Sequence, residues 1–478
     1  MKKWQTLLPL LLLLVLALSA TASAAGCHPD DEAGLLALKS AVTADPTGLL
    51  SSWKPGTDCC TWNGVSCREA SRVTELSIYG KPGDPTSYLS GTIPPSFSRL
   101  RKLVGLYLQD LKNLTGPFPA ALLRLPDIKY VYIRNASLSG TIPDLSPLAA
   151  KLGALGLAGN RFSGPIPESV GKLTQLSQLE LARNRLSGGI PPSVGRLSNL
   201  TTLALDHNEL SGVVPNLSGL TGLYTLQLSH NQLVGEIPRS LAPLAPQLRF
   251  LELGHNRLTG RIPDFLGNFS ALDTLDLSGN LLTGTVPATF RYLTKIFNLD
   301  LSGNALVDPF PEMAVKGIES LDLSHNRFHL GKIPRWVSTS PIIYSLKLAG
   351  CGIKMRMEDF KPAETYFYDY IDLSDNEITG SPAALLNRTQ FLVSFRAAGN
   401  KLRFDMAGLP LPETLQDLDL SRNMVYGKVP AAVAGLKTLD VSYNRLCGQL
   451  PKTQFSASAF AGNACLCGTP LAPCQRRS

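Results

Sequence analysis

Apolar residues recur through most of this chain in one pattern, L-x-x-L-x-L-x-x, which is followed by Asn or Cys. The segments that begin at Leu152, Leu248 and Ile318 show the pattern with different residues at the variable positions. Sixteen copies begin between Val73 and Leu436, with a mean spacing of about 24 residues. Such a period predicts that each copy contacts only its neighbours, so the chain should form an extended solenoid rather than several compact domains.

Two further motifs complete each copy. The L-x-L residues alternate with polar ones, as in a strand with one buried face, so stacked copies predict a parallel sheet that lines a concave face. A Gly, a β-branched residue and a Pro then follow, as in "LSGTIP" at 89–94, and indicate a turn and a second short extended segment. The stretches 351–367 and 401–414 keep the spacing but lack this second motif.

The ninth position of the core is Asn in twelve copies. A buried Asn there can satisfy backbone groups of neighbouring turns, which predicts a ladder of side-chain amides along the solenoid. Cys351 occupies the same position in its own copy, and we interpret it as a buried structural thiol rather than a reactive one. The predicted ladder residues are Asn160, Asn184, Asn208, Asn231, Asn256, Asn280, Asn304, Asn326, Asn376, Asn400, Asn423 and Asn444.

The period and the core together are typical of leucine-rich repeats, which form an α/β solenoid. A solenoid offers one large concave face and no catalytic cleft of its own, so the pattern favours a binding protein over an enzyme. The chain also contains no G-x-S-x-G, Walker or H-E-x-x-H motif.

Residues 1–25 have the features of a secretory signal peptide: Lys2 and Lys3, an apolar run from Leu7 to Leu18, and small residues at 22–24. No later apolar run is long enough to span a membrane, and the end "CQRRS" shows no lipid-anchor signal. We therefore expect a secreted protein without membrane insertion.

The net charge is +8, or +6 without the two signal lysines. Outside the cell this charge suits acidic polysaccharide or protein rather than nucleic acid, or it serves only solubility, which the absence of any block of basic residues favours.

Eight of the nine cysteines form two groups, one on each side of the repeats, which predicts disulfide-bonded caps over the apolar ends of the solenoid. Four cysteines allow three pairings, so spacing alone leaves the connectivity open. A zinc site is disfavoured because C-C and C-x-C differ from the usual C-x2-C spacing. The groups are Cys27, Cys59, Cys60 and Cys67, and Cys447, Cys465, Cys467 and Cys474.

The predicted organisation is a signal peptide (1–25), an N-terminal cap (26–72), the repeats (73–446) and a C-terminal cap with a tail (447–478). In the first cap, "PDDEAGLLALKSAV" predicts a helix with Asp30 as its N-cap. Trp53 and Trp62 are expected to cover the core of the first repeat. Asn-x-Ser/Thr sequons, none of which uses a ladder residue, predict exposed N-glycosylation at Asn113, Asn135, Asn199, Asn216, Asn268 and Asn387.

The middle outward position of the predicted strands is often acidic. Equivalent carboxylates would lie about 5 Å apart on an open, wet sheet. We expect nothing there to desolvate one carboxyl against another, so a glycosidase pair is disfavoured. Either the acids are only a solvent-tolerant consensus or they form a strip that attracts a basic partner. The carboxylates in question are Glu180, Glu252, Asp276, Asp300, Asp322, Asp372, Asp419 and Asp440, whereas Lys347 breaks the series.

The copies from Leu176 to Ile318 are the most regular and provide the predicted partner-binding set. We expect Glu252, Asp276 and Asp300 to be exposed, so that changing all three to Lys would sharply weaken partner binding but barely change thermal stability. The set is Glu180, Asp206, Gln227, Glu252, Asp276, Asp300 and Asp322.

Two other groups recur at fixed positions. A histidine precedes the ladder residue in four copies, which could indicate a metal site, a pH switch or only a position that accepts any polar residue. Tyrosines at outward positions of the first three strands could stack on sugars, anchor a protein partner or reflect ordinary strand preference. The histidines are His207, His230, His255 and His325, and the tyrosines are Tyr79, Tyr107, Tyr130 and Tyr132.

The repeat consensus, with "CHPDDEAGLLALKS" and "SSWKPGTDCCTWNGVSC" before it and "FAGNACLCGTPLAPC" behind, resembles the plant class of extracellular leucine-rich repeat proteins. Within that class it is most similar to polygalacturonase-inhibiting proteins and their longer secreted relatives, over essentially the whole mature chain. The resemblance implies a superhelix with a second short sheet of plant type. It also implies four disulfides: Cys27–Cys59, Cys60–Cys67, Cys447–Cys465 and Cys467–Cys474.

The resemblance further implies a secreted protein of the cell wall, or apoplast, that acts in plant defence by binding or inhibiting a pathogen's pectin-degrading enzyme. The alternative is an apoplastic co-receptor or scaffold that presents a peptide or wall fragment to a receptor kinase. The expected partner on the concave face is thus a secreted polygalacturonase or a receptor kinase ectodomain, with pectin as a further contact. We expect no cofactor, metal or enzymatic activity.

Overall fold

The computed structural model describes residues 26–68 and 71–474, so the predicted signal peptide and the last four residues of the predicted tail lie outside the described residues. The chain divides into two compact units, Met1–Ser187 and Gly188–Ser478. In the described residues, no helix has both the length and the apolar character that a bilayer crossing requires.

The N-terminal cap begins with helix α2 (Pro29–Ala41), whose N-cap is His28. The His28 Nδ1 atom accepts a hydrogen bond of 3.2 Å from the backbone N–H of Asp30. The prediction of Asp30 as N-cap is therefore wrong, because Asp30 already lies in the first turn. Pro29 accounts for the shift: its fixed φ suits the first helical position, and it lacks the N–H that would need a partner there.

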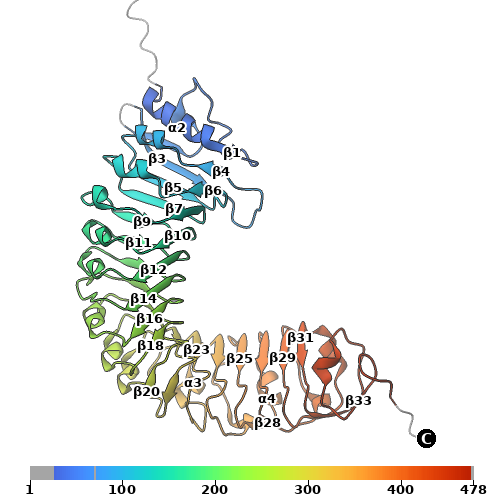
Figure 1. Cartoon of the computed structure of the whole chain (residues 1–478). Coiled ribbons are helices and arrows are strands. Elements are labelled where there is room, and N and C mark those ends of the chain that lie inside the picture. Colours follow the sequence, from blue (N-terminus) through green and yellow to red (C-terminus); the bar gives the residue numbers. More distant parts are fainter. Residues whose placement is uncertain (1–25, 69–70, 475–478) are drawn as a thin grey trace, which may run out of the picture. The chain divides into compact units, whose positions relative to one another are not determined.

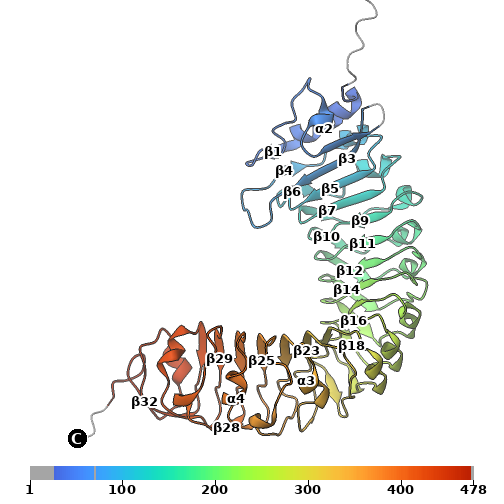
Figure 2. The same ribbon diagram turned by 180° about the vertical axis from the view of Figure 1, so that it is seen from behind.

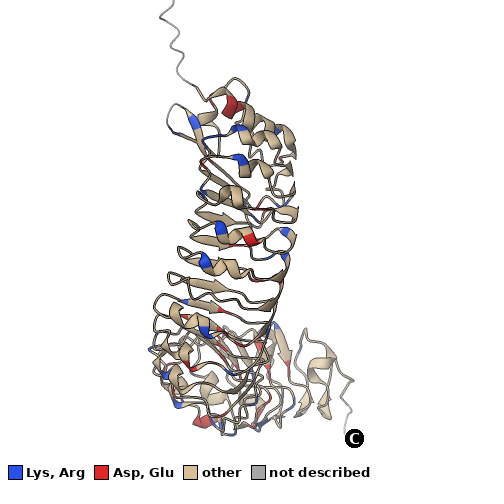
Figure 3. Ribbon diagram, turned by 60° about the vertical axis from the view of Figure 1, so that its left-hand side comes forward, with Lys and Arg blue, Asp and Glu red and all other residues tan. Residues whose placement is uncertain are grey.

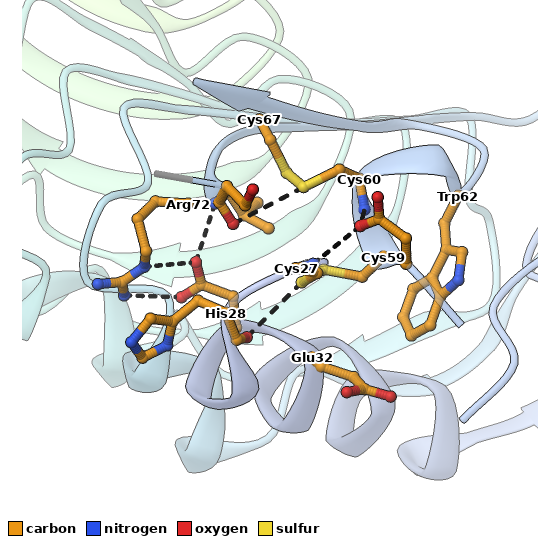
Figure 4. The surroundings of a disulfide bond; sticks show 12 residues. Cys27, His28, Glu32, Cys59, Cys60, Trp62, Cys67 and Arg72 are labelled. Carbon is orange, nitrogen blue, oxygen red and sulfur yellow. Dashed lines mark hydrogen bonds and ion pairs between the residues drawn. A yellow bond between two sulfur atoms is a disulfide. The ribbon is translucent and has the colours of Figure 1, made fainter. Parts of the chain in front are cut away.

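Two disulfides and a tryptophan pair hold this cap together. Cys27 is bonded to Cys59, and Cys60 to Cys67, as the family resemblance implied (Figure 4). Although the sulfur atoms of Cys27, Cys59 and Cys60 lie within 4.8 Å of one another, the disulfides leave no thiolate to bind a metal. Trp53 and Trp62 are buried and stack with 5.7 Å between ring centroids, which confirms them as core residues.

The cap is joined to the repeats through one buried carboxylate. Asp31 is fully buried in α2 and accepts hydrogen bonds from Arg72 Nε at 2.8 Å and from the Val73 backbone at 2.9 Å. A second bond of 2.9 Å from Arg72 makes the pair bidentate (Figure 4). The hydrogen bonds to Asp31 raise the pKa of Arg72. This interaction fixes the helix against the first strand of the repeats.

The main sheet of the first unit starts with an antiparallel pair and continues in parallel, one strand per repeat (Figure 1). Its strands are β2 (Val65–Arg68), β3 (Arg72–Tyr79), β5 (Gly105–Gln109), β7 (Tyr130–Arg134), β9 (Ala154–Gly156) and β11 (Gln178–Glu180).

In the second unit the main sheet is parallel throughout. The strands are β13 (Thr202–Ala204), β15 (Thr225–Gln227), β17 (Phe250–Glu252), β19 (Thr274–Asp276), β21 (Asn298–Asp300), β23 (Ser320–Asp322), β24 (Ser345–Lys347), β25 (Tyr370–Asp372), β27 (Ser394–Arg396), β29 (Asp417–Asp419) and β31 (Thr438–Asp440).

The Gly-x-Ile-Pro motifs form most of a second set of short strands, as the plant-type resemblance implied (Figure 2). In the irregular stretch 351–367 this pairing shrinks to the single bridges Gly331–Ile353 and Arg356–Thr379. In the first unit the strands are β1 (Val42–Ala44), β4 (Ser90–Thr92), β6 (Leu114–Gly116), β8 (Ser137–Gly140) and β10 (Arg161–Gly164); β12 (Arg185–Gly189) pairs with β10. The later ones are β14 (Glu209–Val213), β16 (Gln232–Gly235), β18 (Arg257–Leu258), β20 (Thr283–Thr285), β22 (Ala305–Val307), β26 (Thr379–Gly380), β28 (Lys401–Leu402), β30 (Tyr426–Gly427), β32 (Arg445–Gln449) and β33 (Cys465–Cys467).

Short helices connect the strands of most repeats. In the first unit they are η1 (Cys59–Thr61), η2 (Pro95–Arg99), η3 (Ala120–Arg124), η4 (Ser146–Leu148) and η5 (Glu168–Lys172). In the second unit they are η6 (Pro192–Arg196), η7 (Arg239–Leu244), η8 (Asp264–Asn268), η9 (Ala288–Tyr292), α3 (Arg335–Thr339), η10 (Met357–Asp359), α4 (Ala383–Leu386), η11 (Met406–Gly408), η12 (Ala431–Gly435) and η13 (Ala457–Phe460).

The predicted asparagine ladder is confirmed. Asn280 is typical: its Nδ2 atom donates to the Leu277 and Leu253 carbonyls at 3.1 and 3.0 Å, and its Oδ1 atom accepts from the Leu258 N–H at 2.9 Å. Cys351 is buried and free, as predicted, and its Sγ atom donates to the Leu323 carbonyl at 3.4 Å.

The ladder continues into the predicted C-terminal cap, which the sequence pattern did not reveal. Asn463 accepts from the Leu446 N–H at 2.9 Å and donates to the Val441 carbonyl at 3.0 Å. The cap also contains the disulfides Cys447–Cys465 and Cys467–Cys474, in the pairing that the resemblance implied.

Candidate binding surface on the concave sheet

Four carboxylates lie in register at the centre of the main sheet in the second unit. Glu252 pairs with Asp276, Asp276 with Asp300, and Asp300 with Asp322, on consecutive parallel strands. We call these four residues the acidic row. Parallel strands place equivalent side chains about 5 Å apart, so each carboxylate has another as its neighbour.

The aspartates of the row also support the backbone. The Oδ1 atom of Asp276 accepts from the N–H of Ser278 at 2.9 Å, and Asp300 and Asp322 bind Ser302 and Ser324 in the same way. The same bond recurs at Asp372, Asp419 and Asp440. The "LDLS" consensus is therefore partly structural, because one carboxylate oxygen caps the turn that follows the strand.

The acidic row is less exposed than the sequence predicted. Asp322 is only 9% exposed, and the other three residues are half-buried. Burial, reinforced by the charge of Asp322, raises the pKa of Asp300 to about 6. Burial also raises the pKa of Glu252, although a hydrogen bond of 3.1 Å from Gln227 opposes this shift. We expected an open, wet sheet on which no carboxyl is desolvated. This expectation is wrong, because neighbouring side chains cover part of each carboxylate.

One example shows how this packing arises. Gly254 leaves space beside β17, and the Asp276 carboxylate occupies the volume that a Cβ atom at Gly254 would need. Asp276 Oδ2 thereby comes within 3.5 Å of Ser229 Oγ, across the intervening strand. The replacement of acidic-row residues by lysine is consequently expected to lower stability, contrary to the prediction from the sequence.

Asp206 does not occupy the middle position of its strand, because Ala204 pairs there with Gln227. It lies instead beside three stacked histidines, His207, His230 and His255, whose ring centroids are 4.2 and 4.3 Å apart. Asp206 Oδ2 is 2.9 Å from His207 Nδ1. Burial, with the two neighbouring imidazoles, lowers the pKa of His230.

The backbone explains which residues precede the ladder. His207, His230 and His255 have φ values of 54°, 56° and 52°, in the left-handed region that Gly, Asn and a few polar residues tolerate. Glycine takes the equivalent place at Gly279. The position before the ladder asparagine therefore selects residues that tolerate a positive φ. In the described part of the chain, the only group of three side chains within metal-ligand distance is the cap cysteines, not these histidines.

A cationic and aromatic cluster interrupts the carboxylates at Lys347. Its Nζ atom lies 3.5 Å from Asp322 Oδ2 and 5.5 Å from the centre of the Tyr370 ring. Arg396 lies on β27, the strand that pairs with β25 on its other side, and its guanidinium is 5.9 Å from the centre of the same ring. The Arg396 Nε atom lies 2.6 Å from Asp417 Oδ2. Figure 3 shows that basic and acidic residues are otherwise interspersed along the repeats of each unit.

Glu180 belongs to the first unit, where it forms an ion pair with Arg134. It is therefore not part of the acidic row.

The predicted tyrosines lie at the outward positions of β3, β5 and β7, and Tyr79 and Tyr130 are exposed. All six sequon asparagines are exposed: Asn113, Asn135, Asn199, Asn216, Asn268 and Asn387.

Family models match both the cap and the repeats. The leucine rich repeat N-terminal domain matches residues 28–68. One leucine rich repeat model matches residues 174–233 and 246–306, and a second matches residues 317–340 and 435–455. With the fold described above, these matches show a leucine-rich repeat solenoid that resembles the plant extracellular class.

A curated relative points to the same class. Polygalacturonase inhibitor 2 from Arabidopsis thaliana is 38% identical over 113 residues, which cover 22% of this chain and 34% of the relative. The chain spans about a third of the length of the curated relatives that it matches.

Solved structures share the fold over more of the chain. The crystal structure of a TDR receptor has a TM-score of 0.64 and 29% identity, and covers 84% of this chain and 69% of that one. The Arabidopsis receptor kinase HAESA ectodomain, in complex with a peptide hormone, has a TM-score of 0.54 and 26% identity, and covers 93% and 99%. By name these similar proteins are an inhibitor and the ectodomains of receptors, and together with the disulfides at both ends they support an extracellular binding function.

Proposed function

We propose that this protein is secreted to the plant cell wall, where its acidic row binds a basic surface on a pathogen's pectin-degrading enzyme and inhibits that enzyme. The relatives named polygalacturonase inhibitors support this choice of partner. The observation that carries the proposal is the register of four partly dehydrated carboxylates on strands β17 to β23.

The physical argument concerns the cost of dehydration. An exposed carboxylate must lose its water when it enters an interface, and this loss often cancels the gain from ion pairing. Glu252 and Asp300 are half-buried in the free protein, and this burial raises the pKa of both carboxyls. A lysine or arginine of a partner would therefore meet charges in a medium of lowered dielectric constant, where attraction is stronger.

Catalysis by the same carboxylates is a weaker hypothesis. An acid/base pair needs side chains that are free to exchange protons with a substrate. Here Oδ1 of Asp276, Asp300 and Asp322 is already committed to the backbone N–H two residues later. The periodic recurrence of this arrangement in other repeats indicates a scaffold.

The experiment is a binding and inhibition assay with the purified protein and a panel of fungal polygalacturonases. We expect at least one enzyme to bind, and Glu252→Gln combined with Asp300→Asn to weaken its binding about tenfold or more. The control combines Glu209→Gln with Glu413→Gln, which removes two exposed charges elsewhere in the second unit. No binding across the panel would contradict the proposal.

A second candidate function is the binding of an extended peptide in an apoplastic co-receptor or scaffold. The cluster of Lys347, Tyr370 and Arg396 favours it, because two cations flank an aromatic ring where neighbouring strands carry acids. The similar HAESA ectodomain was solved with a peptide hormone. Co-purification from plant tissue with receptor kinases, and without a wall enzyme, would support this candidate over the first.

A further inference from the structure

Four tyrosines form a second surface, on the main sheet of the first unit. Tyr107 and Tyr132 are opposite each other on β5 and β7. Tyr79 lies at the end of β3, and Tyr130 opens β7; these two side chains are 52% and 41% exposed. We call Tyr79, Tyr107, Tyr130 and Tyr132 the tyrosine platform.

Small residues make room for these rings. Gly105 occupies the outward position beside Tyr130 on β5, and the Tyr107 ring lies so close that a Cβ atom at Gly105 would be 2.8 Å from it. Gly156 is the register partner of Tyr132 on β9. A Cβ atom there would lie 3.0 Å from Tyr132 Cε1 and 3.1 Å from Arg134 Nε. The platform thus depends on glycines at two outward positions.

Polar contacts hold two of the rings in place. Tyr107 and Tyr132 stack with 5.4 Å between centroids and 15° between planes. The Arg134 guanidinium lies 4.4 Å from the Tyr132 centroid and forms an ion pair with Glu180. The Tyr132 hydroxyl donates a hydrogen bond to Gln178. Tyr107 and Tyr132 are therefore ordered before a ligand arrives, so this part of the platform loses little side-chain entropy on binding.

The chemistry of the surface limits what it can bind. From Glu75 to Glu180, the outward positions of these strands carry no aliphatic side chain larger than alanine, so a hydrophobic protein anchor finds no matching pocket. The one cation among them, Arg134, is already paired. Glu75 adds a further carboxylate, which disfavours an anionic sugar such as a uronate.

We propose that the tyrosine platform binds a neutral, β-linked glucan chain. The exposed side chains of Tyr79 and Tyr130 would stack on the apolar faces of sugar rings. Tyr79 pairs with Gln109, and Tyr130 pairs with Gly105 four residues earlier on β5, so the two tyrosines lie about 16 Å apart diagonally across the sheet and would contact different sugars of one chain. Gln109, which pairs in register with Tyr79, offers a donor and an acceptor to sugar hydroxyls. This activity is additional to the proposed binding of an enzyme and uses residues of the other unit.

The test is isothermal titration of the full secreted protein with cellohexaose, and separately with an oligogalacturonide of the same length. We expect heat only with cellohexaose, and about a tenfold loss of affinity in the double variant Tyr79→Ala, Tyr130→Ala. Tyr79→Phe combined with Tyr130→Phe should retain most of the affinity, because stacking needs the ring and not the hydroxyl. Tyr292→Ala, which removes a ring that is 51% exposed in the other unit, is the matched control.

Three results would overturn the proposal: no binding of cellohexaose, binding of the oligogalacturonide alone, or equal loss of affinity in the Tyr292→Ala control. Thermal melts of each variant would show that the fold is intact. Polygalacturonase binding by the Tyr79→Ala, Tyr130→Ala variant separates the two proposals. If the tyrosine variant weakens enzyme binding and cellohexaose does not bind, the platform is part of a protein interface.

Discussion

Asp300 and Asp322 lie opposite each other on the parallel strands β21 and β23, and the first of them has a pKa of about 6. Burial is the main cause, and the neighbouring negative charge adds to it. At neutral pH the folded protein therefore keeps Asp300 ionised in a place that disfavours its charge. A cationic partner would relieve this unfavourable interaction, which is why we assign the acidic row to binding.

The same pair predicts how stability depends on pH. The pKa of Asp300 is about 6 in the folded protein, against an ordinary value of 3.8. Between these values the folded state binds more protons than the unfolded state, so this group adds stability as pH falls through the window. Asp300→Asn keeps the Oδ1 acceptor for Ser302 and removes the charge. We expect its Tm to exceed that of the unmodified protein by about 2 °C at pH 7.5 and to match it near pH 4.

Thermal melts across that pH range, with Glu209→Gln as the exposed control, would check the prediction. A lower Tm for Asp300→Asn at every pH would mean that the charge stabilises the fold.

Asp31 and Arg72 give a prediction for the N-terminal cap. Asp31→Asn leaves the Arg72 guanidinium without its charged partner and should lower the free energy of unfolding by about 3–5 kcal/mol. Asp30→Asn, one residue earlier and exposed, should change it by less than about 0.5 kcal/mol. Denaturant unfolding monitored by the fluorescence of the buried Trp53 and Trp62 measures both. Similar effects of the two substitutions would contradict the role given to Asp31.

The ladder predicts the cost of losing one asparagine. Asn280→Ala removes the acceptor for the Leu258 N–H and the donor for the Leu253 carbonyl, both in the core. The loss should be about 1–3 kcal/mol, because buried backbone groups are left unpaired. Asn298→Ala, at a half-buried outward position of the same unit, is the control for the same change in composition. Equal melting temperatures for the two variants would show that the ladder bonds add little.

Cys351 should be inert in the folded protein. Its side chain is fully buried, and burial raises the pKa of its thiol to about 12, so almost no thiolate is present at pH 8. We expect iodoacetamide to modify Cys351 only in denaturant, as mass mapping of peptides under non-reducing conditions would show. Rapid modification without denaturant, or a disulfide that includes Cys351, would contradict its place in the ladder.

Periodicity explains what could be predicted from the sequence. The strands, the ladder and Cys351 follow from residues whose roles repeat in every copy, and the disulfide pairing followed from resemblance to a family. Asp31 and Arg72 were missed because their contact joins residues far apart in sequence at a place where no period operates. Asn463 was missed because the last turn of the ladder belongs to a copy without the leucine pattern.

The binding surface was only partly predictable. The alternation of apolar and polar residues placed Glu252 and Asp300 on the outward face, which the structure confirms. The alternation could not show that Glu252 and Asp300 are half-buried. Their burial depends on how side chains of adjacent repeats pack into the space beside small residues such as Gly254. The position before the ladder similarly selects for a positive φ, which no polarity pattern expresses.

The most direct test of the central claim is the association rate of an inhibited polygalacturonase, measured by surface plasmon resonance between pH 7.5 and pH 5. Protonation of Asp300 through its pKa of about 6 removes negative charge from the acidic row. We predict that association with a basic partner slows about tenfold across this range. In Glu252→Gln, Asp300→Asn protein, association should be slow at pH 7.5 and change less with pH. Association that is equally fast for both proteins at every pH would contradict the assignment of the acidic row as the binding site.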